Sequence, residues 1–205
     1  SSAASDVYKR QAYVFHTTDG GATYGQVAKL TASDAAAGDS FGVSVAIDGD
    51  TIVVGARFAD TGGAVYVFRT SDGGATYGQV AKLTASDAAA GDIFGFDVAI
   101  DGATIVIGAR GKDSYTGSAY VFRTTDGGAT YGQVAKLTAS DAAAGDYFGV
   151  SVAIDGTTVV VAAVRKDGNT GAVYVFRTSD GGATYVEVAK LTAADAAASD
   201  EFGVS

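Results

Sequence analysis

The chain of 205 residues contains no cysteine, proline, methionine or tryptophan. Without cysteine, neither disulfide bonds nor thiolate metal sites can form. Basic residues are also few: 14 Lys and Arg stand against 23 Asp and Glu, which gives a formal net charge of -9. Such a surface repels phosphate groups, so we predict that nucleic acid is not a partner.

Long apolar stretches are missing as well. No run of the sequence approaches the roughly 20 apolar residues that span a bilayer, and no signal peptide is recognisable. We therefore expect no insertion of this chain into a membrane.

What the sequence has in abundance is a repeat with a period of 53 to 54 residues. Within it, a Phe-Gly dipeptide returns four times, at Phe41-Gly42, Phe94-Gly95, Phe148-Gly149 and Phe202-Gly203. The repeat leaves no change of composition at which a linker could divide the chain. We predict a single repeat array over residues 12–205, with complete units at 34–86, 87–140 and 141–194, preceded by a non-repeat N-terminal tail at 1–11.

Each unit has the pattern of four strands. In the second unit, an alternating run at 94–100 meets Asp101-Gly102, a strong hairpin signal for which we expect a type I′ turn. The next run, 104–109, is apolar on both faces and rich in β-branched residues, as in a strand between neighbouring sheets. Further strands are predicted at 118–124 and 131–138.

The last predicted strand and the segment after it each have a distinctive residue type. The strand at 131–138 carries Lys136, and a lysine on an outermost strand discourages edge-to-edge pairing between molecules. For the segment 138–146 we predict one turn of helix, with Ser140 or Asp141 at its N-cap and Gly145 after its end.

Four strands per unit without long helices favour an all-β fold, a β-propeller of four-stranded antiparallel blades. About four blades are present. The sequence supplies only strands three and four before the first complete unit, and only the start of a first strand after the last one. We therefore expect a partial, open propeller, which as a fragment is unstable, self-associates or closes irregularly.

The Phe-Gly dipeptides, followed about a dozen residues later by Gly55-Ala56 and Gly108-Ala109, resemble the FG-GAP repeat of integrin α-subunit propellers and their microbial relatives. The third unit departs from the pattern with Ala162-Ala163, and proline after Gly-Ala is absent throughout. The resemblance implies a propeller that acts as a non-catalytic recognition or adhesion scaffold, outside the cell or at the cell surface, with a protein or glycan as its ligand.

In that family the hairpin between the first two strands often carries a calcium loop. The corresponding stretches here, at 48–50, 101–103 and 155–157, are too short to wrap the six to eight oxygens that Ca²⁺ takes. We expect no calcium site of that type.

A second resemblance lies at the turn between strands three and four. The segment 17–24 and its copies ending at Tyr77, Tyr131 and Tyr185 resemble the Asp-box of sialidases and related propellers. An aspartate there can accept backbone N–H bonds across the turn, while the glycines permit positive φ. We interpret this turn as a fold element rather than a site.

Antiparallel strands place the two tight turns of each blade on one face and the two longer connections on the other. Loops carry function more often than strands do, and these longer connections diverge most between the copies, so their face is the predicted binding surface. Phe58 and Tyr115 are aromatic residues in polar loops, suited to stacking on a sugar or a protein, or packed on their own loops. The ligand-face candidates are Phe58, Asp60, Lys112, Tyr115, Arg165 and Asn169.

The same face receives a ring of acidic residues from the linkers. Such a ring could hold a divalent cation, Ca²⁺ being the one cofactor considered, or attract a basic partner. The alternative is that one aspartate of each pair caps the linker turn and the other caps the entry to the next strand. The residues are Asp34, Asp39, Asp87, Asp92, Asp141 and Asp146, followed by Asp195 and Asp200.

Residues for catalysis are scarce. His16 is the single histidine and stands where the other copies have arginine, and the only glutamates are Glu187 and Glu201. No Ser-His-Asp or two-carboxylate arrangement can be assembled from them, so we predict no enzyme. The Asp-box-like turns keep one alternative open, the scaffold of a sialidase-like, glycan-cleaving enzyme whose catalytic residues lie outside this chain.

Overall fold

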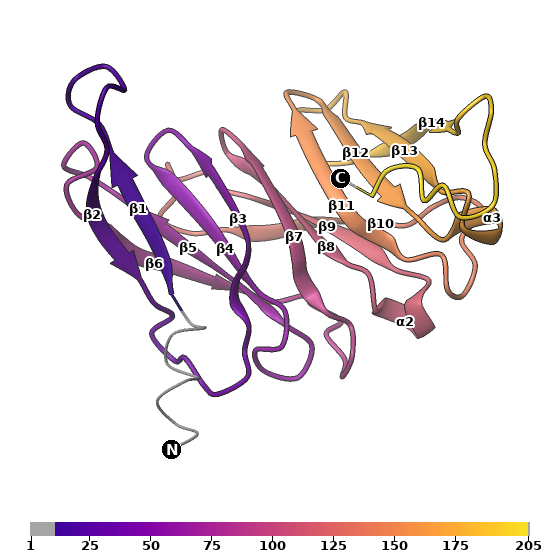
Figure 1. The fold of residues 1–205 in the computed structure, drawn as a ribbon, viewed down its shortest axis with the longest axis horizontal. Coiled ribbons are helices and arrows are strands. Elements are labelled where there is room, and N and C mark those ends of the chain that lie inside the picture. Colours follow the sequence, from indigo (N-terminus) through magenta and orange to yellow (C-terminus); the bar gives the residue numbers. More distant parts are fainter. Residues whose placement is uncertain (1–10, 205) are drawn as a thin grey trace.

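The computed structural model describes residues 11–204, so the prediction for the tail at 1–11 lies almost wholly outside the described residues. Within them the chain forms a two-stranded sheet and three four-stranded sheets, all antiparallel. Figure 1 shows the sheets side by side in sequence order, with the first and the last at opposite ends. The predicted all-β, open propeller of four-stranded blades is confirmed.

In each four-stranded blade, the strands lie side by side in the order in which they occur in the sequence. The two-stranded sheet contains β1 (Ala12–His16) and β2 (Gly25–Leu30). The next contains β3 (Phe41–Asp48), β4 (Thr51–Ala56), β5 (Ala64–Arg69) and β6 (Gly78–Leu83). The remaining two contain β7 (Phe94–Asp101), β8 (Thr104–Ala109), β9 (Ser118–Arg123) and β10 (Gly132–Leu137), then β11 (Phe148–Asp155), β12 (Thr158–Ala163), β13 (Ala172–Arg177) and β14 (Val186–Leu191).

Two short helical turns, α2 (Lys112–Tyr115) and α3 (Lys166–Asn169), lie between the second and third strands of the last two blades. No helix within residues 11–204 has the length and apolar character needed to cross a membrane.

The second strand of each blade lies in the interior, as predicted. Every residue of β8 is buried, because its β-branched side chains pack on sheets at both faces. One hydrophobic cluster joins Val65 and Val67 of β5 with Ile105 and Ile107 of β8. The core therefore lies between neighbouring blades, and a blade depends on its neighbours for stability.

The Phe-Gly dipeptide sets the contact between blades. Within its own blade, the buried Phe94 ring lies 5.5 Å from the Tyr120 ring, centroid to centroid, and it shares a hydrophobic cluster with Val65 of the preceding blade. Gly95 has a φ of +82°, at a register shift between β7 and β8. Its carbonyl oxygen lies against Gly55 of the preceding blade, where an alanine Cβ would overlap it. Two glycines thus allow the backbones of adjacent blades to touch.

Two local predictions were wrong. Asp101 pairs with Thr104, so the central residues of the hairpin turn are Gly102 and Ala103, and only Gly102 has positive φ. That pattern fits a type II′ turn and excludes type I′, which needs positive φ at both. The linker at 138–146 is not a helical turn but two successive tight turns, because the Asp146 carboxylate accepts a hydrogen bond from the N–H of Ala143.

Candidate ligand-binding face

The two faces of the propeller differ in what joins the blades. On the face of the long connections, the amide of Phe94 donates to the carbonyl of Gly62, and the amide of Phe148 donates to that of Thr116. The loop between strands two and three of one blade therefore lies against the entry of the next. We call this side the loop face and the side of the tight hairpins the turn face.

On the turn face, the aspartates of the Asp-box-like turns are fully occupied. The side chain of Thr130 donates to the Asp126 carboxylate at 2.6 Å, the Thr130 amide at 2.9 Å and the Thr124 hydroxyl at 2.7 Å. These bonds hold the pKa of Asp126 well below its usual range, and the same pattern recurs at Asp19, Asp72 and Asp180. The contacts match the structural role predicted for the turn.

A hollow of about 630 Å³ also lies on the turn face, between the sheet β3–β6 and the sheet β7–β10. Its polar lining is largely engaged: the guanidinium of Arg69 donates to the carbonyl of Gly127, and Asp126 is bonded as above. Volume alone therefore does not make it the candidate site.

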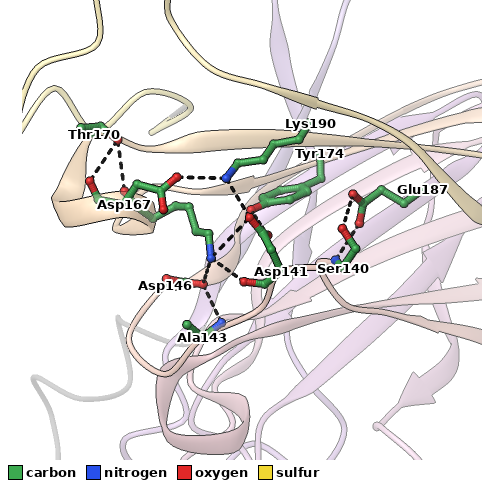
Figure 2. Close-up of polar contacts among 10 residues, drawn as sticks. Ser140, Asp141, Ala143, Asp146, Asp167, Thr170, Tyr174, Glu187 and Lys190 are labelled. Carbon is green, nitrogen blue, oxygen red and sulfur yellow. Dashed lines mark hydrogen bonds and ion pairs between the residues drawn. The ribbon is translucent and has the colours of Figure 1, made fainter.

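On the loop face, the first aspartate of each linker that leads into a four-stranded blade is bound to a tyrosine and a lysine of that blade. Figure 2 shows the last blade, formed by β11–β14, where Asp141 accepts hydrogen bonds from Tyr174 at 2.6 Å and from Lys190 at 2.8 Å. Burial would raise the pKa of Asp141, but the bonds from Lys190 and Tyr174 outweigh it and lower the pKa to about 2. The same set occurs at Asp87, whose pKa is also about 2, and at Asp34.

The second aspartate of each linker binds backbone. Asp146 accepts the amide of Ala143 at 2.8 Å and the ammonium of Lys166 at 3.0 Å, and Lys166 also donates to the carbonyl of Asp141. Asp92 and Lys112 repeat this arrangement in the second complete unit. Asp39 and Asp200 likewise accept the amides of Ala36 and Ala197.

The aspartates of the acidic ring thus hold the linkers in place through hydrogen bonds and ion pairs within the chain. In the alternative reading, one aspartate of each pair caps the linker turn and the other caps the entry to the next strand. The second aspartate does accept an N–H within its linker, whereas the first is bound to a tyrosine and a lysine of the blade instead. Within residues 11–204, no three or more His, Asp or Glu side chains are grouped so that they could hold a metal ion. The edge-strand lysines Lys82, Lys136 and Lys190 also hold linkers and loops through these ion pairs, in addition to any effect on edge pairing.

Half of the predicted ligand-face residues are bonded to other parts of the protein, two through the side chain and one through the backbone. Asp60 forms an ion pair with Lys82 at 2.7 Å. Lys112 is only 5% exposed and bound to Asp92. Among the residues described, Asn169 is bonded only through its backbone, whose N–H donates to the carbonyl of Arg165 and whose carbonyl accepts the N–H of Glu201, and the residue itself is exposed.

The other half remains open to solvent. Phe58 is 53% exposed, Tyr115 is 44% exposed and Arg165 is exposed. Phe58 lies beside Arg57 of its own loop, and Tyr115 packs on Tyr147 of the next blade entry at 5.2 Å. Their role as ligand contacts stays a prediction.

Sequence reasoning missed the main feature of this face, a row of arginines interleaved with aromatic rings. The guanidiniums of Arg57 and Arg110 lie 5.5 and 3.9 Å from the ring centroid of Phe96. Those of Arg110 and Arg165 lie 5.4 and 4.2 Å from that of Tyr147. We call Arg57, Arg110 and Arg165 the arginine row. The signal for this row in the sequence was an arginine one or two positions after the second strand of each complete unit.

The arginine row has no carboxylate partner. Among residues 11–204, none of its members forms an ion pair, and the buried Nε atoms of Arg57 and Arg110 have no hydrogen-bond acceptor. Burial is the main cause that lowers the pKa of Arg110; Tyr147 acts against it, and the charges of Arg57 and Arg165 add to it. The row is therefore a concentration of unbalanced positive charge.

Blades of four antiparallel strands, fanned so that their first strands are neighbours, define a β-propeller repeat protein. The FG-GAP repeat model matches residues 24–68, 77–122 and 131–176, which together make up more than half of the chain. The chain belongs to the FG-GAP repeat family, whose propellers are scaffolds often involved in ligand binding or adhesion.

Among solved structures, the crystal structure of Saccharomyces cerevisiae Sqt1 is similar, with a TM-score of 0.52 and 10% sequence identity. The match covers 75% of this chain and 36% of that one, so this chain spans about a third of the length of Sqt1. At such low identity the likeness shows the fold alone. No curated protein matches the sequence.

Proposed function

We propose that this chain is a non-catalytic recognition module, outside the cell or at the cell surface, which binds a protein or a glycan through its loop face. The carrying observation is the contrast between the faces. On the turn face the aspartates of the repeated turns are bonded within the chain, whereas on the loop face Phe58 and Tyr115 are about half exposed and the arginine row has no carboxylate partner among the described residues.

Membership of the FG-GAP repeat family supports this proposal, because these propellers are typically non-catalytic scaffolds. The divergence of the loops supports it as well. The blades repeat their core and turns, yet the loops at 57–62, 110–117 and 164–171 differ in length and sequence. A constant scaffold with variable loops on one face is the usual arrangement of a binding protein.

The test is a binding screen of the purified chain against a glycan array and a panel of secreted and surface proteins. Any ligand found is then titrated against the double variant Phe58→Ala/Tyr115→Ala. We expect this variant to lose binding, because exposed aromatic residues supply much of the contact energy in such sites. Tyr24→Ala, which removes an exposed tyrosine from the turn face, is the matched control and keeps binding. Loss with Tyr24→Ala but not with the double variant would place the ligand on the wrong face for this proposal.

A second candidate function is the scaffold of a glycan-cleaving enzyme. One observation favours it: the arginine row lies beside Tyr147, a combination suited to holding a charged substrate. Against it, the carboxylate of Glu187 is bound to the amide and the hydroxyl of Ser140, each at 2.8 Å. Because the catalytic residues of this candidate lie outside the chain, its test uses a longer protein that carries the chain: hydrolysis of fluorogenic glycosides by that protein, lost with Tyr147→Phe, would favour this candidate over the first.

A further inference from the structure

The arginine row is open to solvent in part: Arg165 is exposed, and Arg57 and Arg110 are partly exposed. Aromatic rings lie near the groups, as the 3.9 Å from Arg110 to the centroid of Phe96 and the 4.2 Å from Arg165 to that of Tyr147 show. The terminal nitrogens of Arg57 and Arg110 make no hydrogen bond to a described residue and are not among the buried polar atoms without partners. Stacked guanidiniums keep their planar fork of donors free, and this fork fits the two oxygens of a carboxylate or a sulfate.

The acidic residues nearest in sequence are engaged elsewhere. Asp60 pairs with Lys82 at 2.7 Å, Asp113 with Lys136 at 3.6 Å and Asp167 with Lys190 at 2.9 Å. Each loop thus uses its own carboxylate on an edge-strand lysine and leaves its arginine unbalanced. In a chain of net charge -9, the row is a local positive strip that attracts an anion despite the overall repulsion.

The row runs from blade to blade and therefore suits a ligand with anionic groups repeated along its length. Arg57 follows β4, Arg110 follows β8 and Arg165 follows β12, and neighbouring members share one aromatic ring. Half-exposed rings flank it: Phe58 lies beside Arg57, and Tyr115 lies beside Tyr147. A saccharide chain offers both features, since its ring faces are lined by C–H groups while its acidic groups project from the edges.

An acidic peptide would match the charges less well. It presents carboxylates on flexible side chains, and ordering them on binding costs conformational entropy, whereas the rings of a glycan are already stiff. The rings beside the row also offer apolar faces that a polyglutamate chain does not use.

We infer that the arginine row binds the carboxylate or sulfate groups of an acidic glycan, with Phe58 and Tyr115 stacking on its sugar rings. This inference rests on the proposed function and names the ligand class for the same face. It assigns Arg57, Arg110 and Arg165 as the residues that select an anionic glycan over a neutral one.

The test is titration of the chain with polygalacturonate, dextran sulfate, neutral dextran and poly-L-glutamate, followed by calorimetry or biolayer interferometry. We expect binding of at least one of the two acidic polysaccharides, weaker with added NaCl because salt screens the contacts, and none of neutral dextran. Replacing any one arginine of the row by glutamine is expected to weaken binding about ten- to hundredfold, the effect of losing hydrogen bonds to a charged group.

Two further variants separate recognition from net charge and from folding. Arg177→Gln removes the same charge from an exposed position at the end of β13 and leaves binding unchanged. Arg110→Lys keeps the charge but loses the planar fork, so binding falls although the melting temperature and circular dichroism stay close to those of the parent. Equal loss in Arg177→Gln and in the row variants would reduce the effect to net charge and overturn the inference.

The remaining outcomes distinguish this inference from the proposed function. If only neutral glycans or proteins bind, and Phe58→Ala/Tyr115→Ala abolishes that binding, the recognition face stands and the acidic-glycan inference fails. If poly-L-glutamate binds as tightly as the polysaccharides, without dependence on Phe58 and Tyr115, the ligand is an acidic peptide and the inference fails. If acidic polysaccharides bind, but neither the arginine variants nor the aromatic variants bind them more weakly, both the acidic-glycan inference and the proposed function fail.

Discussion

Gly55 and Gly108 show how the absence of a single methyl group determines the distance between blades. An alanine Cβ at Gly108 would overlap the carbonyl oxygen of Gly149 in the next blade, just as one at Gly55 would overlap that of Gly95. The last blade, β11–β14, has Ala162 at this position. The methyl group of Ala162 faces Gly203, and the segment around Gly203 forms a turn rather than a strand. Glycine therefore occupies this position in the blades whose backbone comes close to that of the next blade.

The variant Gly108→Ala is expected to destabilise the chain by about 1–3 kcal/mol, because the added Cβ meets backbone that cannot move without shifting a whole blade. Thermal and urea unfolding measure the difference. Gly132→Ala is the matched control, since its Cβ meets nothing within 4 Å and its φ is not positive; its effect stays within about 0.5 kcal/mol. Equal destabilisation by both would contradict the proposed role of this contact.

Lys112 and Lys136 differ in burial although both bind the linker of the same blade. The side chain of Lys112 is 6% exposed and pairs with the equally buried Asp92, whereas Lys136 is 29% exposed and pairs with the more exposed Asp87. Lys112→Met leaves Asp92 charged and buried, with an expected loss of about 3–5 kcal/mol. Lys136→Met removes a pair screened by water and costs less than about 1 kcal/mol. Chemical denaturation of the two variants checks the ranking, and a larger loss in Lys136→Met would contradict it.

Among the elements, the linkers make stability depend on pH. Asp87 and Asp141 have a pKa of about 2 in the folded chain, because bonds from lysine and tyrosine outweigh the effect of burial, against about 3.9 in an unfolded one. The unfolded chain therefore binds more protons between these values. The stability that these residues contribute is complete above about pH 4 and is lost as the pH falls toward 2.

We expect the urea midpoint to fall steeply between about pH 4 and pH 2. The double variant Asp87→Asn/Asp141→Asn is less stable at neutral pH, and its midpoint changes less over the same range because two of the titrating groups are gone. Unfolding curves of both proteins at a series of pH values give the comparison. The same slope in parent and variant would show that these carboxylates do not carry the effect.

The strands could be predicted from the sequence because each is encoded locally. Residues 104–109 were expected as one apolar strand and form β8 with the same bounds, and the expected strand at 131–138 is β10 shortened to Gly132–Leu137. The hairpin turn was misjudged because the pairing of Asp101 with Thr104 moves the turn by one residue. The linker was misjudged because Asp146 competes for an amide that a helix would use.

The sequence could predict which residues lie on the loop face, but not which of them contact one another there. Its ring of aspartates was recognised, yet their partners Tyr174 and Lys190 lie more than 30 residues further along the chain, on other strands. The arginine row was missed for the same reason: Arg57 meets Phe96 only because two blades are packed together. Contacts between units are not encoded within one unit, and a repeat hides which of its copies will carry a different side chain.

At the scale of the whole molecule, both ends of the array leave apolar side chains uncovered. On β3, beside the two-stranded end sheet, Val45 is 58% exposed and Ile47 62% exposed, and with the strand β1 they line a groove of about 290 Å³. At the other end Val186, Val188 and Val204 are exposed. If each end leaves on the order of 500 Å² of apolar area in water, the burial forgone is ~12 kcal/mol per end at ~25 cal/mol per Å². That is comparable to the ~5–15 kcal/mol stability of a typical domain.

The 205-residue chain is therefore expected to self-associate, since contact between the uncovered ends of two copies removes this area from water. Sedimentation velocity over a range of concentrations would show a sedimentation coefficient that rises with concentration. Val45→Thr/Ile47→Thr makes the groove beside β1 more polar and shifts the protein toward monomer, whereas Val80→Thr, on the outer strand β6, leaves association unchanged. A compact monomer that melts cooperatively at every concentration would mean that the ends are stable in water, and that each blade needs a neighbour on only one side.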